Sequence, residues 1–176
     1  MESIVVYSSQ TGFTKRYAHW LAKALGGNAM PLEKAVKKTD DFFEPFGAII
    51  YGGWAVSGKV SKSSWFTDRI DKWKGKKLAI FCVGASPNES PHVNEILDKL
   101  LTEEQKGYAK AFYCQGGLAY DKMPLGSKLA MKAYAAFLKK RKNQTEDEKM
   151  MAEMVSKSYD IADPKYIAPI VGYITE

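Results

Sequence analysis

A short segment near the N-terminus combines several hydroxyl side chains with one glycine. Ser8–Thr14 runs directly into a segment whose periodicity predicts a helix, and a helix N-terminus presents free N–H groups and a positive dipole end. The segment lacks the lysine of a nucleotide-hydrolysing loop, so it suits a terminal phosphate monoester that is held rather than transferred. The alternative is that the hydroxyls merely cap the helix. The predicted phosphate contacts are Ser9, Gln10, Thr11, Gly12, Phe13 and Thr14.

Three further glycine-bearing segments follow apolar runs, and together they suit a flat aromatic ring. Glycine lets a backbone approach a ring closely, and Trp54 offers a stacking face, although it is also a candidate for the hydrophobic core. Tyr120 is either a ring or substrate contact or a structural residue. Convergence of these loops with the phosphate segment predicts an isoalloxazine site. Its expected residues are Gly53, Trp54, Ala55, Val56, Ser57, Gly58, Val83, Gly84, Ala85, Ser86, Gly116, Gly117, Leu118 and Tyr120.

Other chemistries are disfavoured by residue type and spacing. Gly53–Lys59 has the spacing of a nucleotide-binding P-loop, but Val60 stands where a magnesium-ligating Ser or Thr is required. His19 is expected on the solvent side of a helix, and His92 is either a surface residue or a neighbour of the flavin. The two cysteines, Cys82 and Cys114, lie in apolar runs without metal-ligand spacing and are expected to be buried thiols.

The elements that must position these loops alternate regularly along the chain. Apolar runs at Ser3–Tyr7, Gly47–Tyr51, Lys77–Val83 and Ala109–Cys114, with a weaker one at Ala29–Leu32, predict strands covered on both faces. Helices are predicted between and after them, at Gly12–Leu25, Ser63–Trp73, His92–Leu101, from the Thr145–Glu148 capping box, and from Asp163 to Ile170. The pattern predicts one α/β domain over residues 1–176: a doubly wound, five-stranded parallel sheet with helices on both faces. Ligands bind at the carboxyl ends of such strands.

Composition excludes some classes of protein and localises the charge. The chain has 176 residues, 45% hydrophobic, and a net charge of +6; this is the composition of a globular protein, and no apolar run reaches membrane-spanning length. Seven of the 26 basic residues lie in 122–145, a stretch without an acidic residue, whereas the rest of the chain has 19 basic and 20 acidic residues. The basic excess is therefore local.

The basic stretch is predicted to form an amphipathic helix. Its cationic stripe is expected to attract an acidic partner, an anionic substrate or an anionic membrane surface, or else only to aid solubility. Nucleic acid is disfavoured because no aromatic side chains interleave with the lysines on the same face of the helix and no recognition motif is present. The stripe comprises Lys128, Lys132, Lys139 and Lys142, and the residues expected on the opposite face are Ala130, Tyr134, Phe137 and Leu138.

At the phosphate segment the sequence resembles the flavodoxin family. Ser9–Thr14 reads SQTGFT and matches the family pattern (T/S)-x-T-G-x-T at every fixed position. The runs YGGWAVSGK, FCVGASPNE and QGGLAYDKM resemble the single-domain branch that includes the quinone-dependent protoporphyrinogen oxidase of bacteria. In that enzyme two of these loops each present an arginine–tyrosine pair, whereas here the matching positions are Val56-Ser57 and Ala119-Tyr120. The resemblance implies a flavodoxin-like fold with FMN as cofactor, whereas the two missing arginines do not match the porphyrin-oxidising enzyme.

The leading functional hypothesis is an FMN-binding protein that performs electron transfer or a small oxidoreductase reaction in the cytoplasm, with at most a peripheral membrane attachment. Its expected partners are redox donor and acceptor proteins or a quinone. One alternative is an enzyme of the protoporphyrinogen-oxidase type. Another is a non-enzymatic flavin-binding regulator that uses the basic helix to bind an acidic partner or a membrane surface. No residue is assigned acid–base catalysis, because a flavin ring itself accepts and releases electrons.

Overall fold

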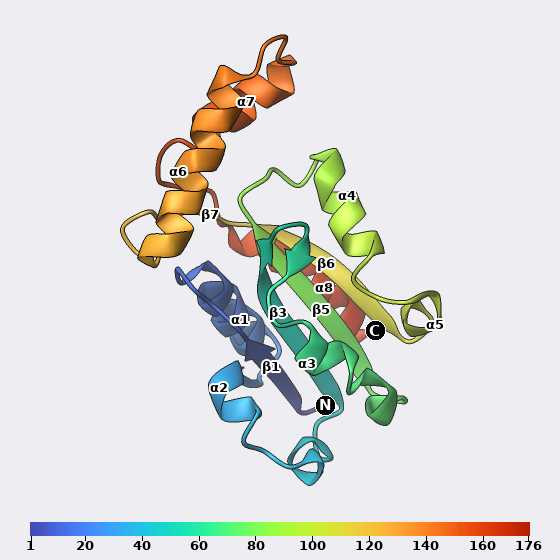
Figure 1. Ribbon diagram of the computed structural model, residues 1–176. Coiled ribbons are helices and arrows are strands. Elements are labelled where there is room, and N and C mark those ends of the chain that lie inside the picture. The colour runs from blue at the N-terminus through green and yellow to red at the C-terminus, as the bar shows by residue number, and fades with distance from the viewer.

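A parallel sheet with strand order β2-β1-β3-β5-β6 forms the centre of the protein (Figure 1). The computed structural model describes the backbone of residues 1–176 and every side chain except those of Pro91 and Asp147. The sheet confirms the predicted doubly wound, five-stranded α/β architecture. Because all five strands are parallel, their carboxyl ends share one edge. The strands are β1 (Ser3–Tyr7), β2 (Asn28–Pro31), β3 (Ala48–Val56), β5 (Lys77–Gly84) and β6 (Ala109–Gln115).

Helices cover both faces of the sheet, as the continuous apolarity of the strands requires. One face packs against α1 (Phe13–Ala24), the 3-10 turn η3 (Pro164–Ile167) and α8 (Ala168–Thr175). The other face packs against residues of several shorter segments. Those segments are α2 (Leu32–Ala35), η1 (Asp40–Phe43), α3 (Ser64–Thr67), η2 (Ile70–Trp73) and α4 (Pro91–Asp98). The short helix α5 (Glu103–Lys106) has no buried residue and precedes β6. The helix predicted over Ser63–Trp73 is thus two shorter turns.

The segment after the third strand differs most from its sequence-based prediction. Residues 53–58 were expected to be an open flavin loop, but β3 continues to Val56 and turns back into β4 (Lys59–Val60). Ser57 and Gly58 both have positive φ, 48° and 72°, as a two-residue hairpin turn requires. A Cβ on Gly53 would lie 2.7 Å from the Ser61 carbonyl oxygen. The lack of a side chain at Gly53 therefore permits close packing within the hairpin.

A pair of helices projects past the carboxyl edge of the sheet (Figure 1). We call this pair the arm: α6 (Leu125–Lys140) and α7 (Glu146–Met154). It lies between β7 (Gly117–Leu118) and β8 (Tyr159–Asp160), which pair antiparallel and close its base. The predicted capping box at the start of α7 is confirmed, with reciprocal hydrogen bonds between Thr145 and Glu148. The described residues include no helix both long and apolar enough to cross a membrane.

The orientation of α6 differs from the predicted one. Ala135 and Leu138 are buried against α7 and β7, but Phe137, expected on the same side as Leu138, is 62% exposed. Leu125 and Leu129 are exposed as well, at 72% and 59%. The helix therefore buries a narrow stripe and exposes apolar side chains in addition to its lysines. Lys142, predicted to belong to the cationic stripe, lies beyond the end of the helix at Lys140.

Candidate functional site

The phosphate segment forms a loop that ends in an uncapped helix. Gly12 has a φ of +99° and precedes α1, and its N–H donates to Ser9 Oγ at 3.2 Å. No side chain among the described residues accepts a hydrogen bond from the first turn of α1. The N–H groups of that turn are thus left as donors, beside the nearly buried hydroxyls of Ser8 and Thr14. This loop can hold an anion with neutral donors.

A cavity of about 340 Å³ lies where the strands end, against this loop. Its lining includes the tip of the β3–β4 hairpin, the end of β5 and the start of β7, so the structure brings all four predicted loops together. Every lining side chain is uncharged. The predicted residues that line it are Gln10, Thr11, Phe13, Thr14, Trp54, Ala55, Val56, Ser57, Val83, Gly84, Ala85, Gly117 and Leu118.

Seven predicted site residues do not line this cavity. Tyr120, predicted to contact a ring or substrate, instead donates its hydroxyl hydrogen bond to the Val155 carbonyl in the arm. Gly116 is packed closely against β5, since a Cβ at this position would lie 2.8 Å from a methyl group of Val83. The residues outside the lining are Ser9, Gly12, Gly53, Gly58, Ser86, Gly116 and Tyr120.

A buried tyrosine and a partly buried one fix the loop that follows β5. Tyr113 donates to the Ser86 carbonyl at 2.8 Å, and Tyr159 donates to the Ala85 carbonyl at 2.7 Å. Burial raises the pKa of both hydroxyls, that of Tyr159 to about 12, so both remain protonated donors. Within the described part of the chain the N–H groups of Ala85 and Ser86 have no hydrogen-bond partner. The loop can therefore donate to a ligand.

Helix α6 forms a roof over the cavity, a feature that the sequence analysis missed. Its contributions are Ser127, Ala130 and Met131, with Met123 just before the helix. Gln10 Nε2 donates to Ser127 Oγ at 3.3 Å and links this roof to the phosphate loop. Ala130 and Met131 follow Ser127 by three and four residues, so the three side chains share one helical face. This spacing is the sequence signal that could have identified the roof.

An ion pair fastens the base of the arm to α1. Arg16 donates two hydrogen bonds to the Asp160 carboxylate, at 2.8 and 2.7 Å, and its guanidinium lies 5.2 Å from the centre of the Phe13 ring. The hydrogen bond from Arg16 lowers the pKa of Asp160. This contact holds β8 beside the first turn of α1 and so helps to position the phosphate loop.

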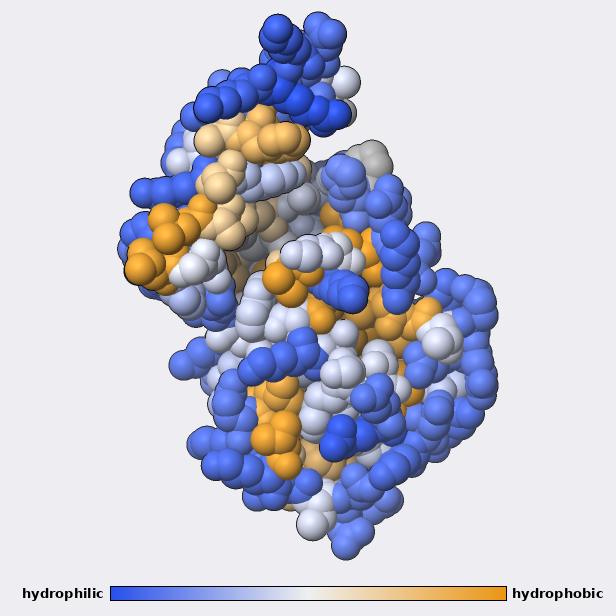
Figure 2. Space-filling model, viewed as in Figure 1, coloured by the Kyte–Doolittle hydropathy of each residue, from blue (hydrophilic) through white to orange (hydrophobic). Residues whose placement is uncertain are grey.

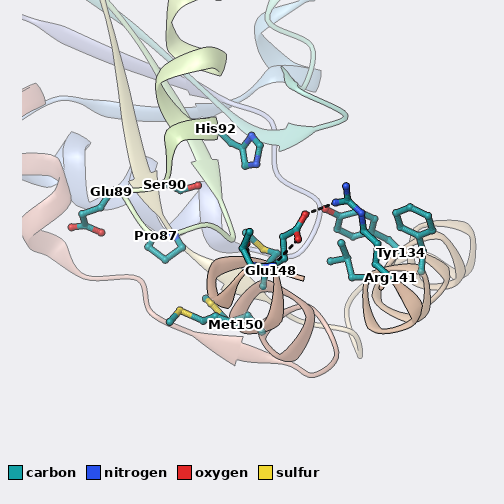
Figure 3. A pocket seen from close by; sticks show the side chains of 13 residues that line it. Pro87, Glu89, Ser90, His92, Tyr134, Arg141, Glu148 and Met150 are labelled. Carbon is teal, nitrogen blue, oxygen red and sulfur yellow. Dashed lines mark hydrogen bonds and ion pairs between the residues drawn. The ribbon is translucent and has the colours of Figure 1, made fainter. Parts of the chain in front are cut away.

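A larger cavity of about 640 Å³ separates the arm from the start of α4 (Figure 3). His92 of α4 lies on one side, with Tyr134 and Arg141 of α6 on the other, and Arg141 is paired with Glu148. Three methionines of α7 also line it. Pro87 belongs to its wall, so the loop after β5 separates this cavity from the first one. His92 is thus exposed toward the second cavity, and it is absent from the lining of the cavity that contains the predicted flavin residues.

Comparison with known proteins places this geometry in a family. The family model described as a flavodoxin domain matches residues 4–147. The flavodoxin-like domain-containing protein BilS of Clostridioides difficile (strain CD3) is 24% identical over 127 residues, which cover 68% of each chain.

Solved structures with which the chain can be superposed are more distant. The flavodoxin WrbA-like protein of Agrobacterium tumefaciens has a TM-score of 0.49 at 20% identity, covering 76% of this chain and 91% of that one. The two-electron reduced flavodoxin of Megasphaera elsdenii has a TM-score of 0.46 at 18% identity, covering 88% of this chain and 98% of that one. The family assignment rests on the match over residues 4–147 together with the strand order: this chain belongs to the flavodoxin family.

Proposed function

We propose that this protein binds FMN in the cavity at the carboxyl edge of the sheet and transfers electrons. One observation carries the proposal: the uncapped N-terminus of α1 borders an uncharged cavity, and the walls of this cavity come from all four strand-end loops. Membership of the flavodoxin family supports the same cofactor, and so does the match of Ser9–Thr14 to the family's phosphate pattern.

The residues present fit the two ends of this cofactor. The first-turn N–H groups of α1, with the hydroxyls of Thr11 and Thr14, would hold the phosphate without a counter-charge. The free N–H groups of Ala85 and Ser86 would donate to the ring edge, and Trp54 borders the space for the ring. Helix α6, which roofs the cavity, would limit the access of water to it. Bound FMN would supply the capacity to accept and release one or two electrons.

A binding titration tests this proposal. Purified apoprotein should quench the fluorescence of added FMN and should bind FMN at least 100-fold more tightly than riboflavin, which lacks the phosphate. Equal affinity of the apoprotein for FMN and riboflavin, or no affinity for either, would refute the proposal. Phosphate should compete with FMN, because it would occupy the same N–H donors.

The second cavity favours an enzymatic version of the same function. It lies across one loop from the proposed flavin site and is lined by Tyr134, Leu138 and the methionines of α7, so it suits a small apolar substrate. An oxidoreductase should use this space in turnover, whereas an electron carrier should not. Substituting Met151 by Lys should then abolish turnover of an apolar acceptor while leaving FMN affinity within twofold. A carrier would instead retain its electron transfer in the variant.

The other expectations remain weaker proposals. A porphyrin-oxidase activity receives no support from Tyr120, whose hydroxyl is engaged inside the arm. Action in the cytoplasm is supported by two buried free cysteines, because disulfides are rare under reducing conditions. Redox donor and acceptor proteins are proposed as partners, and an anaerobic photoreduction that counts the electrons taken up in each step would distinguish one-electron from two-electron partners.

A further inference from the structure

The outer surface of α6 carries two parallel rows of side chains, all of them exposed except the partly buried Lys128. One row, spaced by four residues, is apolar: Leu125, Leu129, Ala133 and Phe137. The adjacent row, with the same spacing, is mainly cationic: Lys128, Lys132, Ala136 and Lys140. Lys139 lies next to the second row. Side chains four apart lie above one another on a helix, so each row runs along its whole length.

The apolar row forms the outermost line of the helix. At about 100° per residue its mean direction is roughly opposite to that of Ala135 and Leu138, the two buried residues. Leu125 and Leu129 line neither of the two cavities described above, whereas Phe137, at the far end of the row, borders the larger one. Figure 2 shows the resulting apolar area over the N-terminal half of α6. Leu125 and Leu129 thus project from a convex surface and pack against no other part of the described structure.

The lysines beside this row have no counter-charges in the described structure. None of Lys128, Lys132, Lys139 and Lys140 takes part in an ion pair among the described residues. The stretch 122–145 also contains no acidic residue. A convex apolar row with cations along one side is complementary to a deformable anionic surface. Each apolar side chain can insert into such a surface separately, and the lysines can extend their ammonium groups toward its anions. A folded protein partner would need a groove shaped to the same line.

We propose that the outer surface of α6 docks this protein on membranes with anionic lipid headgroups. Leu125 and Leu129 insert at the interface, and the adjacent lysines lie at the headgroup level. The opposite side of the same helix roofs the cavity proposed for FMN, so docking would place that cavity one helix away from the membrane surface. The inference does not depend on whether FMN binds.

Vesicle co-sedimentation tests the proposal. The full-length protein should bind vesicles of phosphatidylcholine with 30% phosphatidylglycerol at least tenfold more tightly than vesicles of phosphatidylcholine alone. The binding should decline in 0.5 M NaCl, since salt screens exposed charges. Equal binding to both vesicles, or binding to neither, would overturn the proposal and leave the surface to an acidic protein partner.

Two pairs of variants separate this surface from general effects. A charge-reversal variant of α6 should no longer bind the anionic vesicles; in it Glu replaces Lys128, Lys132, Lys139 and Lys140. Its control reverses four exposed lysines of the body and should retain most of the vesicle binding; these are Lys23, Lys34, Lys37 and Lys99. L125S/L129S should bind at least fivefold more weakly at unchanged charge, whereas V36S, at a residue 55% exposed on the body, should bind normally. Equal losses in a test variant and its control would refute a role of α6. FMN affinity, measured in parallel, should be unchanged in all four variants.

Discussion

The phosphate loop depends on one residue with a left-handed backbone. Gly12 has a φ of +99° directly before α1, where an L side chain is strained by about 1–2 kcal/mol. We expect Gly12→Ala to lower the free energy of unfolding by about that amount and to raise the Kd for FMN about tenfold. Urea denaturation and fluorescence titration measure the two effects.

Gly26→Ala is a matched control for that variant. Gly26 also has a positive φ, +62°, and open space around it, but it follows the opposite end of α1. Its substitution should lower stability similarly while leaving the affinity for FMN unchanged. Equal losses of affinity in both variants would show that Gly12 acts through general stability.

Gly52 is required for a different reason, which is the lack of space beside β3. A Cβ at this position would lie 2.1 Å from the fully buried ring of Phe81. Gly52→Ala should therefore lower the free energy of unfolding by about 1–3 kcal/mol through overpacking. Gly126→Ala, in α6 with open space around it, should instead raise stability by about 0.5 kcal/mol. Urea denaturation of both variants measures the contrast, and a neutral Gly52 variant would contradict the packing.

At the level of elements, the Arg16–Asp160 ion pair makes stability depend on pH. The folded-state pKa of Asp160 is lowered, so its contribution is present above the usual carboxyl pKa near 4 and is lost as pH falls through the folded value. Both side chains are more than a third exposed, so we expect only about 0.5–1 kcal/mol. Asp160→Asn should be destabilised by this amount at pH 7 and should match the parent protein near pH 2. A pH-independent difference between the two proteins would assign the effect to packing.

The arm and the body form largely separate packing units. The arm's cluster of Leu118, Ala135, Leu138, Ala152 and Val155 is distinct from the two clusters that cover the sheet. Because β7 and β8 are paired at its base, Leu118 and Tyr159 can be joined by a short turn once the arm is removed.

At the scale of the whole molecule, this separation predicts that the body folds without the arm. A variant in which residues 119–158 are replaced by Asn-Gly should unfold cooperatively in urea and retain its helix and strand signals in circular dichroism. Its affinity for FMN should fall at least tenfold, because the roof formed by Ser127, Ala130 and Met131 is lost. An unfolded variant would show that the sheet depends on the arm.

Much of the fold could be predicted from local sequence. Apolar runs such as Ser3–Tyr7 and Lys77–Gly84 indicate strands buried on both faces, and the alternation of strands with helices then leaves few topologies. The hairpin at Ser57-Gly58 escaped prediction because the two-residue strand that it joins to β3 is too short to show a period. Tyr120 was considered for the site because it lies in the loop after the fifth predicted strand, but its direction depends on the carbonyl of Val155, 35 residues away.

The sequence by itself determined the alternation of strands and helices, the hydroxyl-rich loop before α1 and the local excess of positive charge. These are properties of single segments, set by periodicity, helix termini and composition. Only the tertiary structure decided what surrounds the cavity and which surface of α6 meets solvent. The roof, the two tyrosines that fix the loop after β5 and the exposed apolar row all arise from contacts between distant segments. Their geometry is fixed by packing, which local patterns do not specify.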